Sequence, residues 1–167
     1  MLFDTKDYKV DFVQQEDLED ILGIYNSNIQ FLRKHMELDM VTREWLLEEV
    51  MDMKKVGFNS CKIIEISSGK IIGIMDYKVG DETYLSLLMI HNDYRGKGIG
   101  NLIYQAFEEY LKSLNSKCIR IDVVTNYNNL VTEFWINKGF IKFNDIKLNW
   151  TGKIMPAVTM KKYLNNY

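Results

Sequence analysis

A short glycine-rich segment in the middle of the chain has the residue types and spacing of an anion-binding loop. It runs from Arg95 to Gly100 and reads RGKGIG, so that three glycines alternate with other residues just before a strongly amphipathic stretch. Glycine tolerates positive φ and lets backbone N–H groups come close to a ligand. At the start of a helix, unpaired N–H groups and the helix dipole attract negative charge, which Arg95 and Lys97 would reinforce. The segment therefore predicts a phosphate or pyrophosphate site, with a plain tight turn into a helix as the alternative.

Two common phosphate loops have a different spacing. A P-loop needs Gly-x-x-x-x-Gly-Lys-Ser/Thr, but His91 stands five residues before Gly96. The dinucleotide fingerprint needs a third glycine where this chain has Asn101. Asp122 follows at the distance expected of a ribose ligand, yet the strand before the loop belongs to an antiparallel meander. A nucleotide-binding domain therefore stays only as a rival hypothesis.

Local patterns predict the elements that must position this loop, in the order β-α-α-β-β-β-α-β-α-β-β. Apolar residues at alternating or helical spacing, Thr42 as an N-cap, Gly57 and Gly139 as helix ends, and short glycine turns mark the boundaries. A strand after a helical crossover should run parallel to the strand before it. The expected strands cover 9–14, 61–67, 70–78, 82–90, 118–125, 140–148 and 154–163, and the last two form a hairpin around Thr151-Gly152. One helix is expected directly after Asp17, and further helices over 42–57, 99–114 and 128–138. The stretch 26–41 is expected to hold a short helix and a loop.

Two motifs then resemble a known family. Arg95-x-x-Gly98-x-Gly100 resembles motif A of the GNAT superfamily of N-acetyltransferases, which reads Gln/Arg-x-x-Gly-x-Gly/Ala. The resemblance extends to the element order and covers roughly residues 9–164. It implies a GNAT fold, an α/β (α+β) architecture with a mixed, mostly antiparallel, splayed sheet flanked by helices, in a single domain over 1–167.

A second block is similar to motif B of the same family. It consists of Asn128, Val131, Trp135 and the pair Gly139-Phe140, at the spacings where the family usually has Asn, Ala, Tyr and Gly-Phe. By this resemblance the co-substrate is acetyl-CoA or another acyl-CoA, with its pyrophosphate on the loop amides and its pantetheine arm along the strand end in the splay. Helix capping is an equally good reading of Asn126 and Asn128. The residues expected to bind the cofactor are Met89, Ile90, Arg95, Gly96, Lys97, Gly98, Ile99, Gly100, Asn126, Asn128 and Trp135.

The implied reaction is direct attack of a neutral amine on the thioester carbonyl. A backbone N–H near Ile90 could stabilise the oxyanion. Trp135 replaces the tyrosine that often serves as general acid, and an indole N–H is not a useful acid; a thiol with a pKa of about 8.5 can leave as thiolate without one. We expect Trp135 to pack on the helix of motif A or to wall the acyl pocket. The expected catalytic residues are Ile90, Tyr84, Glu82 and Asp76. The base is left open: Tyr84 and Glu82 lie on the strand where some relatives have a glutamate, and Asp76 or Glu65 on neighbouring strands could accept the amine proton through water.

Composition excludes several other classes. The chain of 167 residues has 21 basic and 23 acidic residues, a net charge of −2, which argues against non-specific binding to nucleic acid or an anionic membrane. The N-terminus lacks the pattern of a signal peptide, and Cys61 and Cys118 are expected to be buried, reduced thiols. The predictions are a cytoplasmic protein without a metal.

The acceptor is expected to be a primary amine of a small molecule or peptide. By the resemblance, residues 26–44 and the last hairpin border the acceptor side, and the candidates there are Phe31, His35, Glu37, Asp39 and Trp150. A homodimer is compatible with the aromatic content. The alternative is a non-catalytic acyl-CoA-binding or protein-interaction module on the same fold. Two features favour it: Trp135 stands in place of the family's tyrosine, and the middle of the strand before motif A has no glutamate.

Overall fold

The computed structural model describes residues 1–150 and 152–164 and contains every element that local patterns predict. In chain order the elements are β1 (Phe3–Asp4), β2 (Tyr8–Phe12), the 3-10 turn η1 (Gln15–Asp17), α1 (Leu18–Ser27), α2 (Ile29–Met36), α3 (Arg43–Lys55), β3 (Asn59–Glu65), β4 (Ile71–Lys78), β5 (Glu82–Ile90), the 3-10 turn η2 (Asn92–Tyr94), α4 (Ile99–Ser113), β6 (Cys118–Val124), α5 (Asn129–Asn137), β7 (Ile141–Trp150) and β8 (Lys153–Tyr163). The short strand β1 goes beyond the expectation, because it is too short for a periodic pattern, whereas α2 is the short helix expected within 26–41, with a loop after it.

Local residue choices explain several boundaries. Thr42 caps α3, because its side chain accepts a hydrogen bond from the N–H of Trp45 at 3.2 Å. Gly57 and Gly139 follow α3 and α5 with φ of 88° and 89°, the left-handed conformation that favours glycine after a helix. In the last hairpin, Gly152 has φ of 83°, and Thr151 lies outside the described residues.

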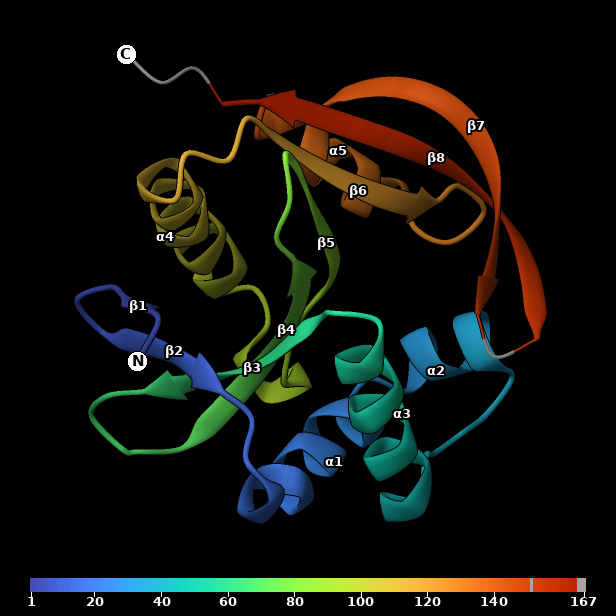
Figure 1. Ribbon diagram of the computed structural model, residues 1–167. Helices are drawn as coiled ribbons and strands as arrows, with labels where there is room; N and C mark the ends of the chain where they lie inside the picture. Colours follow the sequence, from blue (N-terminus) through green and yellow to red (C-terminus); the bar gives the residue numbers. More distant parts are fainter. Residues whose placement is uncertain (151, 165–167) are drawn as a thin grey trace.

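The strands form one mixed sheet in the order β1-β2-β3-β4-β5-β6-β8-β7 (Figure 1). Neighbouring strands are antiparallel except β5 and β6, which are parallel and are joined through α4. The predicted fold class and the predicted parallel pair are therefore confirmed. None of the helices in the described ranges is long and apolar enough to cross a membrane.

Two apolar cores hold the helices on opposite faces of this sheet. One core joins α4 to the sheet through residues such as Ile103, Phe107 and Tyr77. The other core joins α1, α2 and α3 to the opposite face through residues such as Leu18 and Leu46. Figure 1 shows α4 and the group of α1, α2 and α3 on either side of β4 and β5. The free thiols Cys61 and Cys118 are buried, as expected, and burial raises the pKa of both.

The sheet splits between β5 and β6. The two strands pair from Glu82 to Tyr84 and from Cys118 to Arg120. Beyond that point β5 continues along β4 and β6 continues along β8, so their carboxyl ends separate. The predicted splay is therefore present, with its closed end at the start of β5 and its open end near Ile90.

Candidate active site

The loop before α4 holds its glycines in the conformation that the sequence suggested. Gly96 and Gly98 have φ of 75° and 76°, and Gly98 is the N-cap of α4. A Cβ built at Gly96, Gly98 or Gly100 would meet no heavy atom within 4 Å. Glycine at 96 and 98 therefore allows the positive φ of the loop, and the space in front of the loop is open. The first N–H groups of the helix have no partner within the helix.

Three basic side chains lie near this helix start. Within the described residues, Arg95, Lys97 and Lys138 form none of the ion pairs. Lys97 Nζ lies 5.0 Å from the centroid of the Tyr94 ring, and Lys138 Nζ donates to Asn101 Oδ1 in the first turn of α4. Sequence reasoning missed Lys138, because its contact depends on how α5 packs across α4. The arrangement suits an anion such as a pyrophosphate.

The end of β5 turns one set of backbone groups into the splay. Ile90 pairs with Gly73, and the N–H of the next residue, His91, donates to Ile72 O at 2.8 Å. In an antiparallel ladder this makes Ile90 and Gly73 a pair without mutual hydrogen bonds. The N–H and C=O of Ile90 therefore point away from β4 and toward the open side. The C=O of Ile90 accepts a hydrogen bond from Asn28 Nδ2 at 3.1 Å.

Met89 is oriented differently from the expectation. It pairs with Ile74 in the hydrogen-bonded position of the ladder, so its backbone groups are directed to β4. Its side chain is buried in the core under α1 and α3. By the same alternation, Leu88 shares the direction of Ile90. The sequence did not single out Leu88, because only the pairing with β4 shows which alternate residues direct their backbone groups into the splay.

A β-bulge in β5 determines the face of the sheet to which the side chains in the second half of this strand point. Asp76 pairs with Leu87 and Tyr77 pairs with Leu85, which leaves Ser86 as an extra residue in β5. Ser86 Oγ donates to Asp76 O at 3.2 Å. A bulge exchanges the faces to which the side chains before and after it point, which is why Leu85 and Leu87 lie in different cores.

The three side chains expected to receive the amine proton lie in three separate environments. Glu82 forms an ion pair with Lys161 at 2.5 Å at the closed end of the splay. Burial raises the pKa of Tyr84, and the charge and hydrogen bond of Asp122 raise it further. Strand geometry puts Glu82 about 26 Å and Tyr84 about 20 Å from Ile90 along β5.

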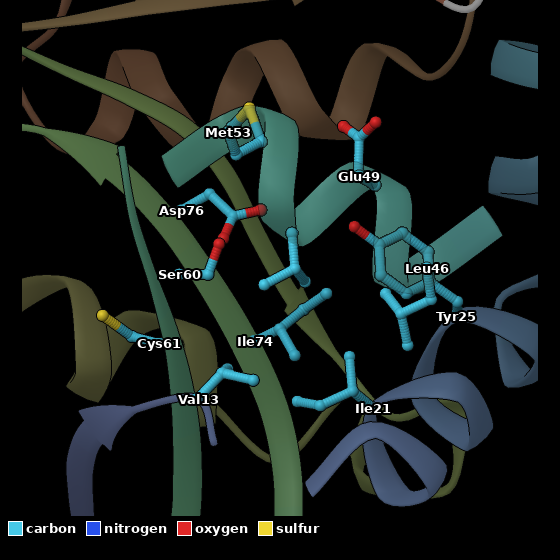
Figure 2. A pocket seen from close by; sticks show the side chains of 11 residues that line it. Val13, Ile21, Tyr25, Leu46, Glu49, Met53, Ser60, Cys61, Ile74 and Asp76 are labelled. Carbon is cyan, nitrogen blue, oxygen red and sulfur yellow. The ribbon is translucent and has the colours of Figure 1, made fainter. Parts of the chain in front are cut away.

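Asp76 lies beneath α1 and α3. It is 8% exposed and lines a cavity of about 10 Å³, enough for one water molecule. Figure 2 shows its carboxyl group beside Ser60, with Tyr25 and Glu49 on the helices across the cavity. Burial raises the pKa of Asp76 to about 7, opposed by the hydrogen bond of Ser60. Its register partner Leu87 is three residues before Ile90, so Asp76 is nearer the open end than the other two.

A polar cluster that the sequence did not predict marks the closed end of the splay. Asp122 accepts hydrogen bonds from Arg120 Nε at 3.2 Å and from Arg120 Nη2 at 2.8 Å, and from Thr159 Oγ1 at 2.8 Å. The Arg120 guanidinium lies 4.9 Å from the centroid of the Tyr84 ring. This cluster fills the place where pairing between β5 and β6 stops.

Trp135 packs on α4, as expected. Its ring lies edge-on to Tyr104 at 5.4 Å and to Phe140 at 5.2 Å between centroids. Tyr104 donates its hydroxyl hydrogen to Glu108 at 2.9 Å. Burial, and then the charge of Glu108, raises the pKa of Tyr104, so this hydroxyl is held as a structural donor.

The loop between β6 and α5 borders the open end. Asn128 is the N-cap of α5 and accepts from the N–H of Leu130 at 2.9 Å, so the capping reading of this residue is observed. Asn126 is exposed in the preceding turn. Tyr127 faces α2, with its ring 5.0 Å from that of His35.

Helix α2 spans the gap between the separated strands. At its start, Asn28 bonds Ile90 as described, and Ser27 Oγ accepts from the N–H of Asn92 at 3.0 Å. At its other end, Glu37 forms an ion pair with Lys153 of β8 at 3.0 Å. Figure 1 shows α2 beside the adjoining ends of β7 and β8. The open end of the splay is thereby covered on the side of α1, α2 and α3.

Comparison with known proteins agrees with this geometry. Residues 19–140 match the Acetyltransferase (GNAT) family. The spermidine N-acetyltransferase from Vibrio cholerae, solved with CoA and spermine, has 16% sequence identity and a TM-score of 0.72, over 95% of this chain and 96% of that one. An acetyltransferase from Thermus thermophilus has 17% identity and a TM-score of 0.72, over 95% and 97% of the two chains. The ribosomal-protein-S18-alanine N-acetyltransferase from Escherichia coli has 13% identity and a TM-score of 0.69, over 93% of each.

These findings define the protein as an N-acetyltransferase. The chain belongs to the GNAT acetyltransferase family, whose members use acetyl-CoA. The identities to the solved structures are low, so those structures establish the fold. A search of curated proteins finds no match.

Proposed function

We propose that this enzyme transfers an acetyl group from acetyl-CoA to a primary amine of a small molecule or peptide by direct attack, with residues 1–167 as one catalytic domain. The observation that carries the proposal is the pairing of an open glycine loop at the start of α4 with a sheet that splits beside it. Acetyl-CoA supplies the activated acyl group when it is bound. The pyrophosphate needs amide donors and cations, and the pantetheine arm needs free strand backbone.

The residues of this chain fit those needs. The N–H groups from Gly96 to Gly100 would hold the pyrophosphate, with the side chains of Arg95 and Lys97 as neutralising charges, whereas the N–H of Arg95 itself already donates to Asn92 O at 3.1 Å. The backbone of Ile90 would pair with the pantetheine arm, and its N–H would stabilise the oxyanion, because a fixed backbone donor needs no reorganisation. Asn126, Asn128 and Trp135 would border the cofactor at the open end of the splay.

Calorimetry with acetyl-CoA, followed by detection of free thiol released in the presence of amines, tests this function. The panel holds spermidine, a peptide with an N-terminal alanine and a simple alkylamine, because two structural neighbours are named as N-acetyltransferases of spermidine and of a ribosomal-protein alanine. We expect acetyl-CoA binding and thiol release that depends on one of these amines. Absence of acetyl-CoA binding at millimolar concentration would overturn the proposal.

The alternative is a module that binds acyl-CoA without catalysis. Trp135 in place of the family's tyrosine is the observation that favours it, since an indole is not a useful acid. Tight binding of acetyl-CoA together with thiol release no faster than spontaneous hydrolysis, for every amine in the panel, would select this alternative.

A further inference from the structure

His35 is enclosed by aromatic rings where α2 meets the loop after β6. The ring of Phe31 stacks on it with centroids 4.1 Å apart. Tyr127 and Trp150 contact it edge-on, at 5.0 Å and 5.6 Å. These neighbours come from three separate segments of the chain, and His35 is 5% exposed. The imidazole is therefore held in a single orientation by its packing.

One hydrogen bond fixes the tautomer of this imidazole. Nδ1 of His35 lies 3.0 Å from the carbonyl oxygen of Phe31. A carbonyl oxygen can only accept, so Nδ1 carries the hydrogen and Nε2 of the neutral ring carries a lone pair. The nitrogen of this ring that can take up a proton is therefore Nε2, the nitrogen that is not bonded to the Phe31 carbonyl.

Helix α2 places His35 at the open end of the splay. Asn28, just before α2, bonds the carbonyl of Ile90, and His35 lies near the other end of the helix, next to the loop after β6. The rise of an α-helix separates these two residues by about 10 Å. For the amine hydrogen to reach His35, a thioester carbonyl bound at the Ile90 N–H and the attacking amine would have to lie along this interval.

We propose that His35 is the general base of the acetyl transfer. The amine nitrogen forms a bond to the carbonyl carbon, the carbon–sulfur bond breaks, and CoA leaves as thiolate. The amine proton passes to Nε2 of His35, and the imidazolium then returns it to thiolate or water. The carbonyl of Phe31 orients the ring, as a hydrogen-bond acceptor on the second nitrogen does in other His bases. The proposal rests on the proposed function.

The surroundings of His35 keep its imidazole neutral, which is the form that a general base needs before the proton transfer. Burial lowers the pKa of His35, the bond to Phe31 opposes that shift, and the charges of Lys153 and Lys34 lower the pKa further. The charge on Lys153 is itself paired with Glu37. The ring is therefore neutral at pH 7, and the hydrogen bond to the Phe31 carbonyl is the interaction that favours the imidazolium once it forms.

The pH dependence of catalysis tests the proposal. His35→Asn keeps an amide donor for the Phe31 carbonyl but has no basic nitrogen. We expect this variant to lose at least about 100-fold in kcat, the usual contribution of a general base, and to lose the acidic limb of kcat/KM against pH. The midpoint of that limb in the wild type should lie below about 6.5. Unchanged acetyl-CoA affinity and thermal unfolding would show that the variant is folded.

Phe31→Leu is the matched control for a purely structural role. It keeps the backbone carbonyl and removes the stacked ring, so we expect the acidic limb to persist and kcat to fall by less than about 10-fold. If His35→Asn behaves like this control, with its acidic limb retained, the proposal is overturned while the proposed function stands.

A measurement without catalysis completes the test. The chain has two histidines, so ¹⁵N-NMR of the ring nitrogens, assigned with His91→Asn, reports the tautomer and the pKa of His35 directly. We expect the Nδ1–H tautomer and a pKa that matches the kinetic limb. The Nε2–H tautomer, or a ring that is protonated at pH 7, would overturn the proposal whether or not an acceptor has been found.

Discussion

The two ends of α4 carry their charges in opposite ways. In its second half, Glu108 accepts hydrogen bonds from Lys162 at 2.5 Å and from Tyr104 at 2.9 Å and lies 3.3 Å from Lys112 Nζ. At its start, Arg95 and Lys97 make no ion pair with the described residues, and the first turn has no acidic residue.

The difference separates binding from stability on a single helix. Charges that are satisfied within the chain contribute to the free energy of unfolding and offer little to a ligand. Cations left beside unpaired helix N–H groups are available to an external anion. Substitutions at the start of α4 should therefore change the affinity for acetyl-CoA, and substitutions in its second half should change the free energy of unfolding.

The largest effect is expected from Gly98→Trp. The indole would occupy the open space in front of the loop, and an L-residue is strained at a φ of 76°. We expect calorimetry to show acetyl-CoA affinity reduced at least about 100-fold, because the amide donors can no longer approach the pyrophosphate.

Gly69→Trp is the control for this change. Gly69 has φ of 70° and equally open surroundings in the turn between β3 and β4, so it shares the backbone strain but not the position. Acetyl-CoA affinity should be unchanged in this variant. An equal loss of affinity in both variants would mean that strain, and not blockage of the loop, explains the effect.

A smaller effect is expected from removing charge at the start of α4. The double variant Arg95→Gln, Lys97→Gln should weaken acetyl-CoA binding by roughly 10-fold and make it less sensitive to salt, since exposed charges are screened. Lys112→Gln removes one positive charge from the same helix, where it is already paired with Glu109 at 2.7 Å, and should leave the affinity unchanged. If Lys112→Gln weakens binding as much as the double variant, net charge rather than the local site governs affinity.

Sequence reasoning succeeded where the cause is local and failed where it depends on pairing. The bounds of β5 are as predicted, and the N-cap of α3 is Thr42, because turns and caps are encoded by neighbouring residues. The loop of motif A was found because its glycines are needed by the backbone itself. The bulge at Ser86, which sets the faces of Leu87 to Ile90 relative to the first half of β5, follows from the register with β4, which no local pattern specifies.

The candidate base illustrates the same limit. His35 was singled out for the acceptor side because its segment borders that side in the family, but its tautomer depends on a turn of α2 that the weak pattern over 26–41 did not resolve. Its neighbours Tyr127 and Trp150 come from segments about a hundred residues away. Contacts at such separations arise from the assembled fold and leave no periodic signal in the chain.

The last prediction concerns the paired half of α4. Glu108→Gln should lower the free energy of unfolding by about 1–3 kcal/mol at neutral pH, since it removes a charge that several donors share, and should leave acetyl-CoA affinity unchanged.

Although burial alone would raise the pKa of Glu108, the bonds from Lys162 and Tyr104 outweigh it and lower that pKa. The stabilisation is therefore present above the ordinary glutamate pKa of about 4.3 and is lost as the pH falls below it. Denaturant unfolding of both proteins between acidic and neutral pH should show their difference shrinking toward zero in acid. Glu109→Gln, whose side chain is 72% exposed, should cost no more than about 0.5 kcal/mol. A difference for Glu108→Gln that persists undiminished in acid would show that side-chain shape, and not charge pairing, is what this end of the helix requires.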